Sequence, residues 1–401
     1  MASQEQNAVA LAAAAEITAL VSNSGDSALT EADRARVLQA ASRIVTSIEK
    51  PEDGILKFAY SPSIWMAIRC CVQLDVFAVI SQQETISSRE IAETCHCDEA
   101  LIRRLLRVLT ASGFVAEKGD GLYGATLWTK HMEKRLTKAT IKFLFDQSMP
   151  SIAVAPEWFR QRAYQNPTDP MEGLFHAAFH TDMAVFPWFA LPENKERWDD
   201  ANTFFEGDRG SRASWVTWFP VKEKLLDGRD RDSTAPVLVD VAGGRGHDLM
   251  EFLDQFPEEP GPFVLQDQQP VLDSALGSLP DKVRTQAFDF FKEAPVGGAR
   301  IYFMKFILHD YGDGQCLEIL RNVKKSMVRG YSYLVINEFV LPDTGCSLLQ
   351  AEWDLMMMVL LSSMERTESQ WRSLLDDADL EVEGIYRPEG DGQGIIVAKL
   401  R

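Results

Sequence analysis

The chain has 401 residues, of which 46% are hydrophobic and 25% charged, a composition typical of soluble globular proteins. Its 59 acidic residues outnumber 41 basic ones, and the formal net charge of -18 argues against nonspecific binding to nucleic acid or to anionic lipid. No apolar run approaches the roughly 18 residues that cross a bilayer, and the first residues lack the basic region of a signal peptide. We therefore expect a cytoplasmic protein of two or more domains, with no nucleic acid and no membrane among its partners.

Residues 1–125 are predicted to form a mainly helical domain, because apolar residues recur there at helical spacing. The predicted helices cover residues 8–20, 64–77, 85–93 and 98–110, and two short strands cover residues 114–117 and 122–125. Two helices followed by a hairpin are typical of a winged helix-turn-helix. Arg103, Arg104 and Arg107 lie on the second helix, where a DNA-binding protein carries its recognition residues. The acidic net charge favours the other interpretation, a solvated face on a structural module.

Six cysteines in so long a chain do not form a disulfide framework, and this favours a reduced compartment. Cys95 and Cys97 flank His96, which would suggest zinc. Structural zinc sites, however, need more ligands than these three, and their paired cysteines are commonly separated by longer spacers. We expect no metal here.

Residues 126–230 are predicted to be a helical linker, rich in aromatic residues and repeatedly interrupted by proline. His176 and His180 lie one helical turn apart, but Ala177 stands where a zinc protease helix has glutamate, so metal binding is the minor interpretation. A substrate pocket is the preferred one. Its expected members are His176, Phe179, His180 and Trp188, together with Met357 from a later methionine-rich helix.

From residue 231 to 401 short apolar strands alternate with helices, which predicts an α/β domain with a doubly wound, mainly parallel sheet. The expected strands cover residues 236–242, 262–267, 284–288, 300–308 and 332–341, and the expected helices cover 247–256, 313–328 and 351–364.

A glycine-rich turn follows the first of these strands and begins a helix. Asp240 opens the turn and Gly243, Gly244 and Gly246 continue it, allowing the backbone to approach a ligand closely. The spacing is not that of a dinucleotide fingerprint. Asp267 lies 21 residues after Gly246 at a strand end, where a carboxylate can accept ribose hydroxyl groups. After the third strand, Asp289 and Phe290 are candidates to meet the edge and face of an adenine ring.

His309 is expected at the end of the fourth strand, in the crevice where open α/β sheets bind ligands. A neutral imidazole accepts protons well near physiological pH. Glu338, at the end of the next strand, and Glu365 are candidate carboxylate partners that would fix its tautomer. No clustered set of carboxylates resembles a magnesium site, so no metal is expected.

These residues resemble, in order and spacing, the S-adenosylmethionine-dependent O-methyltransferases of the caffeate type and their fungal relatives in secondary metabolism. The resemblance covers nearly the whole chain, from the winged-helix dimerisation domain to the loop at 240–246, Asp267, Lys305 ahead of His309 and the Glu365-Arg366-Thr367 signature. It implies a Rossmann-like catalytic domain and a homodimer. It also implies S-adenosyl-L-methionine as cofactor and an aromatic, polyketide-like substrate with a phenolic or enolic hydroxyl group.

Carried over residue by residue, the resemblance implies a role for each motif. The glycines would surround the methionyl part of the cofactor, Asp267 would hold its ribose, Asp289 and Phe290 would lie at the adenine, and Lys305 would lie near the cofactor. His309 would be the base, with Glu338 and Glu365 beside it. Ala242, in place of the usual first glycine, adds one methyl group that we expect the site to tolerate. Ser363 and Met364 replace the usual glycine before the signature.

Two alternatives remain open. Some fungal proteins that resemble this family catalyse pericyclic or dehydration steps and use the bound sulfonium only as a fixed positive charge. Retention of His309 favours methyl transfer, although His131 is a second imidazole that could serve such a role. The other alternative is a non-catalytic scaffold that uses its winged helix to bind DNA.

Overall fold

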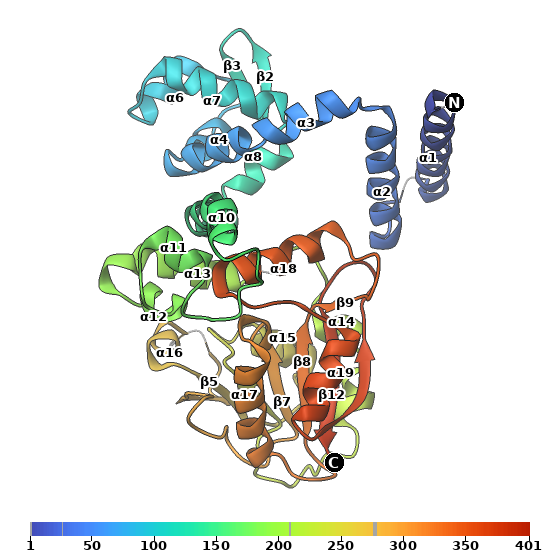
Figure 1. Cartoon of the computed structure of the whole chain (residues 1–401), viewed down its shortest axis with the longest axis vertical. Coiled ribbons are helices and arrows are strands. Elements are labelled where there is room, and N and C mark those ends of the chain that lie inside the picture. Colours follow the sequence, from blue (N-terminus) through green and yellow to red (C-terminus); the bar gives the residue numbers. More distant parts are fainter. Residues whose placement is uncertain (1, 26, 208–209, 276–278) are drawn as a thin grey trace. The chain divides into compact units, whose positions relative to one another are not determined.

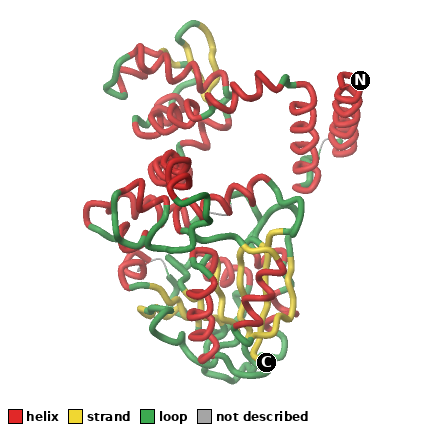
Figure 2. The backbone as a smooth tube through the Cα atoms, in the orientation of Figure 1, coloured by secondary structure: helices red, strands yellow, loops and turns green. Residues whose placement is uncertain are grey.

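The computed structural model describes residues 2–25, 27–207, 210–275 and 279–401. The chain divides into two compact units, Met1–Ile141 and Lys142–Arg401, shown in Figures 1 and 2. Residues 126–230, expected as one linking region, contribute to both units. Within the described ranges, none of the helices has the length and hydrophobicity needed to span a bilayer.

The first unit is mainly helical, as predicted. Its helices are α1 (Ala2–Ser24), α2 (Glu31–Ile48), α3 (Pro51–Tyr60), α4 (Pro62–Gln73), α5 (Val76–Ser81), α6 (Ser88–Thr94), α7 (Glu99–Ala111) and α8 (Leu127–Met132), followed by α9 (Arg135–Phe143) at its boundary. The helix expected at 64–77 is divided into α4 and α5, because Asp75 adopts a left-handed φ of 57° that no helix continues through.

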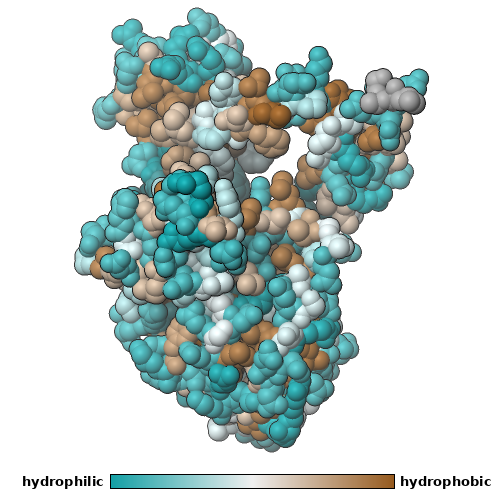
Figure 3. Space-filling view, in the orientation of Figure 1, coloured by the Kyte–Doolittle hydropathy of each residue, from teal (hydrophilic) through white to brown (hydrophobic). Residues whose placement is uncertain are grey.

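A small antiparallel sheet completes the predicted winged helix. It consists of β1 (Ile86–Ser87), β2 (Val115–Gly119) and β3 (Leu122–Ala125) in the order β1-β3-β2. Arg103 of α7 pairs at 2.5 Å with Asp120 in the β2–β3 turn, so this arginine has a partner within the module itself. On α3, Ile55, Leu56 and Phe58 are exposed, and Figure 3 shows hydrophobic residues over this helix.

The second unit begins with short helices. They are η1 (Leu144–Ser148), α10 (Met149–Gln161), α11 (Leu174–Phe179), α12 (Val185–Phe189), η2 (Pro192–Asn194), α13 (Lys195–Phe205), α14 (Trp215–Trp218) and η3 (Lys222–Leu226). Proline was expected to interrupt helices throughout this region, but Pro156 lies inside α10. Phe143, Phe175, Phe189 and Phe204 are buried in an aromatic cluster that these helices share with α18 (Leu348–Leu361).

A seven-stranded sheet follows, with strand order β11-β12-β8-β7-β4-β5-β6. Its strands are β4 (Leu238–Val241), β5 (Phe263–Asp267), β6 (Val283–Ala287), β7 (Ile301–Lys305), β8 (Tyr333–Glu338), β11 (Leu380–Tyr386) and β12 (Gly394–Leu400). The strands from β4 to β8 pair in parallel, and β12 is antiparallel to β8 and β11. A separate two-residue parallel pair joins β9 (Val340–Leu341) to β10 (Arg366–Thr367).

Helices cover both faces of the sheet, as predicted for a doubly wound fold (Figure 1). One face packs against α17 (Asp313–Ser326) and α19 (Glu368–Asp377), and the opposite face packs against α14, α15 (His247–Gln255) and α16 (Gln269–Ala275). Successive residues of β7 alternate between the two cores, with Tyr302 and Met304 on one side and Ile301 and Phe303 on the other. The sheet order reverses at β4, between β5 and β7, where ligands of such folds bind.

Two expected strand ends differ from the structure. The strand predicted to continue to Leu308 ends at Lys305, because Phe306 takes a left-handed φ of 51° and turns the chain into the short helix η4 (Leu308–Asp310). The third strand, β6, ends at Ala287, so Asp289 lies in the following turn. Strands β11 and β12 lie beyond the segments for which strands were predicted.

Candidate active site

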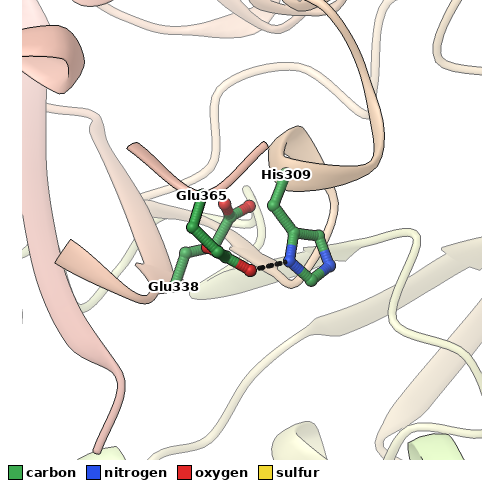
Figure 4. Close-up of side chains that lie close together, drawn as sticks. All are labelled: His309, Glu338 and Glu365. Carbon is green, nitrogen blue, oxygen red and sulfur yellow. Dashed lines mark hydrogen bonds and ion pairs between the residues drawn. The ribbon is translucent and has the colours of Figure 1, made fainter. Parts of the chain in front are cut away.

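His309 lies in η4, directly after the carboxyl end of β7, and is 4% exposed. Its Nδ1 is 2.6 Å from Oε1 of Glu365, and its Nε2 is 3.3 Å from Oδ1 of Asp310. Figure 4 shows His309 with Glu365 and Glu338 beside it. The three residues that the sequence grouped as a catalytic set are therefore together in space, and Asp310 is an additional partner of the ring.

Glu338 ends β8 and holds the backbone that carries the histidine. Its Oε1 accepts hydrogen bonds from the backbone N–H groups of Ile307 at 3.0 Å and Leu308 at 2.7 Å. The other oxygens of Glu338 and Glu365, both Oε2, are buried without a hydrogen-bond partner among the described residues. These two acceptors remain available to a ligand.

Arg366 fixes the other side of the same turn and is 1% exposed. Its guanidinium donates to the carbonyl oxygens of Leu308 and Tyr311, each at 2.9 Å, and pairs with Asp313 at 2.8 Å. A buried arginine without such partners would be costly, so these contacts specify one conformation of the turn. The sequence indicated Arg366 only as part of a signature.

A stack of rings covers the imidazole. Phe306 lies 4.8 Å from the ring of His309 at an interplanar angle of 22°, and it also stacks on Trp353 of α18, at 5.4 Å and 10°. Sequence reasoning missed both aromatic residues. The only signal was that Phe306 lies between Lys305 and His309, because its left-handed backbone cannot be read from residue type.

The site has an unusual balance of charge. Burial by itself lowers the pKa of His309, but the negative charges of Glu365 and Asp310 outweigh burial and raise it from 6.5 to about 10. Burial raises the pKa of Asp310 to about 6 and that of Glu338 to about 7, although the positive charge of His309 opposes both shifts. At neutral pH the ligand-free site therefore contains an imidazolium surrounded by carboxyl groups.

The same three side chains also meet a geometric requirement for a metal ion. One ligand atom from each of His309, Glu338 and Glu365 lies within 4.8 Å of the others, and all three residues are buried. No metal was expected from the sequence. The hydrogen bond from His309 to Glu365 and those from the backbone to Glu338 already account for one atom of each carboxylate.

The glycine-rich turn lies at the end of β4, next to β7 in the sheet. A β-carbon at Gly243 would lie 2.2 Å from Cγ of Asp240, so a side chain here would force the loop or the Asp240 carboxyl group to shift. Gly244 adopts a φ of 60°, and its backbone N–H donates to Oδ2 of Asp267 at 2.8 Å. Gly246 takes a φ of 82° and begins α15. The loop and the strand-end carboxylate therefore meet directly.

The charged groups around this turn are largely buried. Burial raises the pKa of Asp240 well above its ordinary range, and it also raises the pKa of Asp267. Lys305 at the end of β7 pairs with Oδ2 of Asp248 at 3.0 Å. Oδ2 of Asp240 and Oδ1 of Asp248 are buried and have no hydrogen-bond partner in the described part of the chain.

Asp289 and Phe290 lie in the turn after β6. Asp289 pairs with Lys292 at 2.7 Å and accepts a hydrogen bond from the backbone N–H of Phe291 at 3.0 Å. The Lys292 contact lowers the pKa of Asp289 and keeps it ionised. The ring of Phe290 packs against Phe291 and Tyr311.

The expected pocket residues are only partly assembled. Phe179 and Trp188 pack together at 5.0 Å within the aromatic cluster that includes α18. His176 accepts a hydrogen bond from the backbone N–H of Gly173 at 3.1 Å and so caps α11, while its Nε2 is buried without a partner among described residues. His180, by contrast, is exposed at the other end of α11, and Met357 is half-buried on α18.

The chain is similar to known O-methyltransferases in both of its units. A family model described as an O-methyltransferase domain matches residues 214–381, and one for an O-methyltransferase dimerisation domain matches residues 56–131. The chain is 34% identical to "O-methyltransferase penC" of Penicillium thymicola, over 91% of each protein.

Two solved structures are also similar over nearly their whole length. "The structure of LepI complex with SAM" is 27% identical, with a TM-score of 0.88, and the match covers 97% of this chain and 98% of the other. "A Pericyclic Reaction enzyme" is 26% identical at the same TM-score, with coverage of 96% and 97%. The similarity thus extends to proteins named for two kinds of reaction.

Proposed function

The chain belongs to the S-adenosylmethionine-dependent O-methyltransferases, and we propose that it methylates a phenolic or enolic hydroxyl group of a secondary metabolite with His309 as general base. The observation that carries this proposal is the position of His309. It is a buried imidazole at the end of β7, held by Glu365 and adjacent in the sheet to the glycine-rich turn after β4. When bound, S-adenosylmethionine supplies an electrophilic methyl group on a positively charged sulfur.

The residues of the turn fit this cofactor. The unpartnered acceptors of Asp240 and Asp248 would accept hydrogen bonds from its ammonium group, and Asp267 would bind the ribose hydroxyl groups. Gly243, Gly244 and Gly246 would allow the backbone to approach the methionyl part, with Lys305 near it. Asp289 and Phe290 would lie at the adenine.

His309 would accept the hydroxyl proton at Nε2, because Nδ1 is committed to Glu365. Glu365 fixes the tautomer and stabilises the imidazolium that forms, while Glu338 keeps the supporting backbone in place. General-base assistance typically contributes about 10²–10⁴-fold in rate, and the rest of the acceleration comes from aligning the reacting groups.

The raised pKa of His309 sets a condition on this role. In the ligand-free protein the ring of His309 is a positively charged imidazolium at neutral pH. It must lose the proton on Nε2 before it can act as a base. A positive charge bound nearby favours this loss, because like charges repel. Binding of the cofactor would therefore lower the pKa of His309 and favour the neutral imidazole that can act as a base.

The substrate is proposed to be a flat aromatic molecule. The aromatic cluster with Phe179 and Trp188, the free Nε2 of His176 and the methionines around Met357 support an apolar surface with few polar groups. The role predicted for His180 receives no support from its exposed position. A homodimer is proposed from the match to the dimerisation domain.

One incubation tests the proposal. The protein is mixed with S-adenosylmethionine carrying a labelled methyl group and a panel of polyketide phenols. Methyl transfer predicts a product heavier by one methyl group and one equivalent of S-adenosylhomocysteine per product. A transformed product without S-adenosylhomocysteine would refute it.

That second outcome describes the other candidate function, a pericyclase or dehydratase that does not consume its cofactor. Two observations support this second candidate. The chain is similar to a pericyclic enzyme, and the raised pKa of His309 suits a proton donor. His131, exposed on α8, would be a further imidazole for such a reaction. The pH dependence separates the two, because a base gains activity with rising pH and an acid loses it.

A further inference from the structure

We propose that Trp353 and Asp354 of α18 are positioning residues that fix the imidazole of His309 from two directions, acting through Phe306 and Glu365. The inference deepens the proposed function and rests on it, because it assigns a role to residues that act on the base. Neither residue belongs to the family signatures from which the site was predicted.

Trp353 acts on the face of the imidazole. Its indole is nearly parallel to the ring of Phe306, at 10°, and Phe306 in turn stacks on His309 at 22°. Phe339 packs against both Phe306 and Trp353 and closes the side of the stack. Rotation of the imidazole out of its plane would therefore require the phenyl ring to move against the indole.

Asp354 acts on the edge of the imidazole. Its Oδ1 accepts a hydrogen bond of 2.8 Å from the backbone N–H of Glu365, whose side chain holds Nδ1 of His309 at 2.6 Å. Successive residues of a helix point about 100° apart, so neighbours on α18 can serve two different partners. One rigid helix thus fixes both the plane and the direction of the base.

The turn that carries His309 needs such support. Phe306 has a left-handed φ of 51°, a conformation that a β-carbon disfavours, and the turn would relax if its neighbours allowed it. Glu338 and Arg366 hold its backbone, through the N–H and the carbonyl group of Leu308. The ring itself is held by Glu365, Asp310 and Phe306.

The same helix also carries the methionines expected to line the substrate pocket, Met356–Met358. The same helix, α18, therefore supports His309 and carries part of the proposed substrate surface. A shift of about 1 Å in a reacting group can cost about 10²-fold in rate, so this common support has a direct consequence for turnover.

Two matched pairs of variants test the inference. Trp353→Phe keeps a flat ring and Trp353→Leu removes it. Asp354→Asn keeps an acceptor for the Glu365 N–H and Asp354→Ala removes it. We expect Trp353→Leu and Asp354→Ala each to lower kcat about tenfold or more, and their conservative partners to stay within about threefold of wild type. The KM and Kd for S-adenosylmethionine should not change, and Leu355→Ala, on the exposed side of α18, should leave kcat unchanged.

A second readout is independent of turnover. In protein with labelled histidine, the NMR signals of His309 should shift and broaden in Trp353→Leu and Asp354→Ala but not in Leu355→Ala. If Trp353→Leu fails to fold, Phe306→Leu removes the middle ring of the stack and is expected to give the same shift and loss.

The outcomes are distinguishable from failure of the proposed function. If His309→Ala abolishes turnover while Trp353→Leu and Asp354→Ala retain wild-type kcat and unchanged His309 signals, the inference is wrong and the base assignment stands. If His309→Ala keeps wild-type turnover, the base assignment fails, and the NMR signals alone then decide whether α18 fixes the ring.

Discussion

Oε1 of Glu365 lies 2.6 Å from Nδ1 of His309, and both side chains are buried, whereas Nε2 of the same ring lies 3.3 Å from Asp310. The shorter contact assigns a proton to Nδ1, since a carboxylate can only accept. In the proposed reaction, Nε2 is then the nitrogen that would exchange a proton with the substrate. This asymmetry gives each nitrogen of one imidazole a separate task.

Replacing His309 by alanine should remove that task without disturbing the cofactor. We expect kcat for methyl transfer to fall at least about a hundredfold, the range of general-base catalysis, and the Kd for S-adenosylmethionine to stay within about threefold. Steady-state kinetics and isothermal titration calorimetry measure the two quantities. His180→Ala, at an exposed helix end, is the matched control and should behave as wild type. Near-normal turnover in His309→Ala would exclude this residue as the base.

Protonation of His309 should depend on the charge of the ligand. Because its folded pKa is raised to about 10, the ligand-free ring should remain an imidazolium through neutral pH and lose its proton only as pH approaches that value. Bound S-adenosylmethionine, which is positively charged at sulfur, should lower the pKa more than S-adenosylhomocysteine, which is neutral there. NMR titration of labelled histidine, assigned with His309→Gln, measures the shift.

The kinetic consequence has a definite sign. The pH profile of kcat/KM for S-adenosylmethionine reports the pKa values of the free enzyme, and the pH profile of kcat reports those of the bound complex. If His309 is the base, both should rise with pH, and the kcat limb should lie at lower pH because the bound cation depresses the pKa of His309. Profiles that fall over the same range would instead identify a proton donor and favour the pericyclase or dehydratase.

Much of the site could be predicted from the sequence because its members follow strand ends. Asp267 and Glu338 are the last residues of β5 and β8, and parallel strands bring their carboxyl ends to one edge of the sheet. Phe306 and Trp353 could not be found in this way. The stacking of Phe306 on His309 and of Trp353 on Phe306 depends on a left-handed backbone at Phe306 and on the packing of α18, and neither leaves a periodic pattern.

The limits of the fold prediction have similar causes. Helical spacing over residues 64–77 gave one helix, because the left-handed turn at Asp75 does not alter the hydrophobic pattern. The apolar run to Leu308 likewise suggested a longer strand than β7, but Phe306, Ile307 and Leu308 lie beyond the strand, and only Leu308 is fully buried. A hydrophobic pattern does not mark the residue at which the backbone leaves a strand or a helix.

Gly243→Ala should impair cofactor binding. The new β-carbon would lie 2.2 Å from Cγ of Asp240, so either the loop or the carboxylate must move. We expect the Kd for S-adenosylmethionine to rise about tenfold or more, because this loop is proposed to surround the cofactor. Gly297→Ala is the control, since no atom lies within 4 Å of its β-carbon position. Unchanged affinity in Gly243→Ala would show that the loop has room to adjust.

Chelation tests whether catalysis requires a metal ion bound by His309, Glu338 and Glu365. The proposed reaction assigns the imidazole to proton transfer and needs no metal, so dialysis against EDTA should leave kcat unchanged. Added Zn²⁺ should inhibit, because imidazole nitrogen and carboxylate oxygen are among its usual ligands, and zinc binding would withdraw His309 from the reaction. Loss of activity on chelation, restored by one metal and not by others, would contradict the proposed mechanism.

Ala242→Gly should stabilise the protein. Ala242 has a φ of 59°, held there by hydrogen bonds from its own N–H and that of Gly243 to the carbonyl oxygen of Gln266. A left-handed conformation costs a non-glycine residue about 1–2 kcal/mol, and the greater freedom of glycine in the unfolded chain offsets about 0.4–1 kcal/mol of the gain. A net gain of about 0.5–1 kcal/mol in the free energy of unfolding should appear as a higher urea midpoint at unchanged slope.

Ala153→Gly, on the exposed side of α10, is the control and should instead lower the urea midpoint, since glycine costs about 1 kcal/mol in a helix. If both variants lower it, the backbone at Ala242 is not strained, and the methyl group has a packing role that outweighs its conformation.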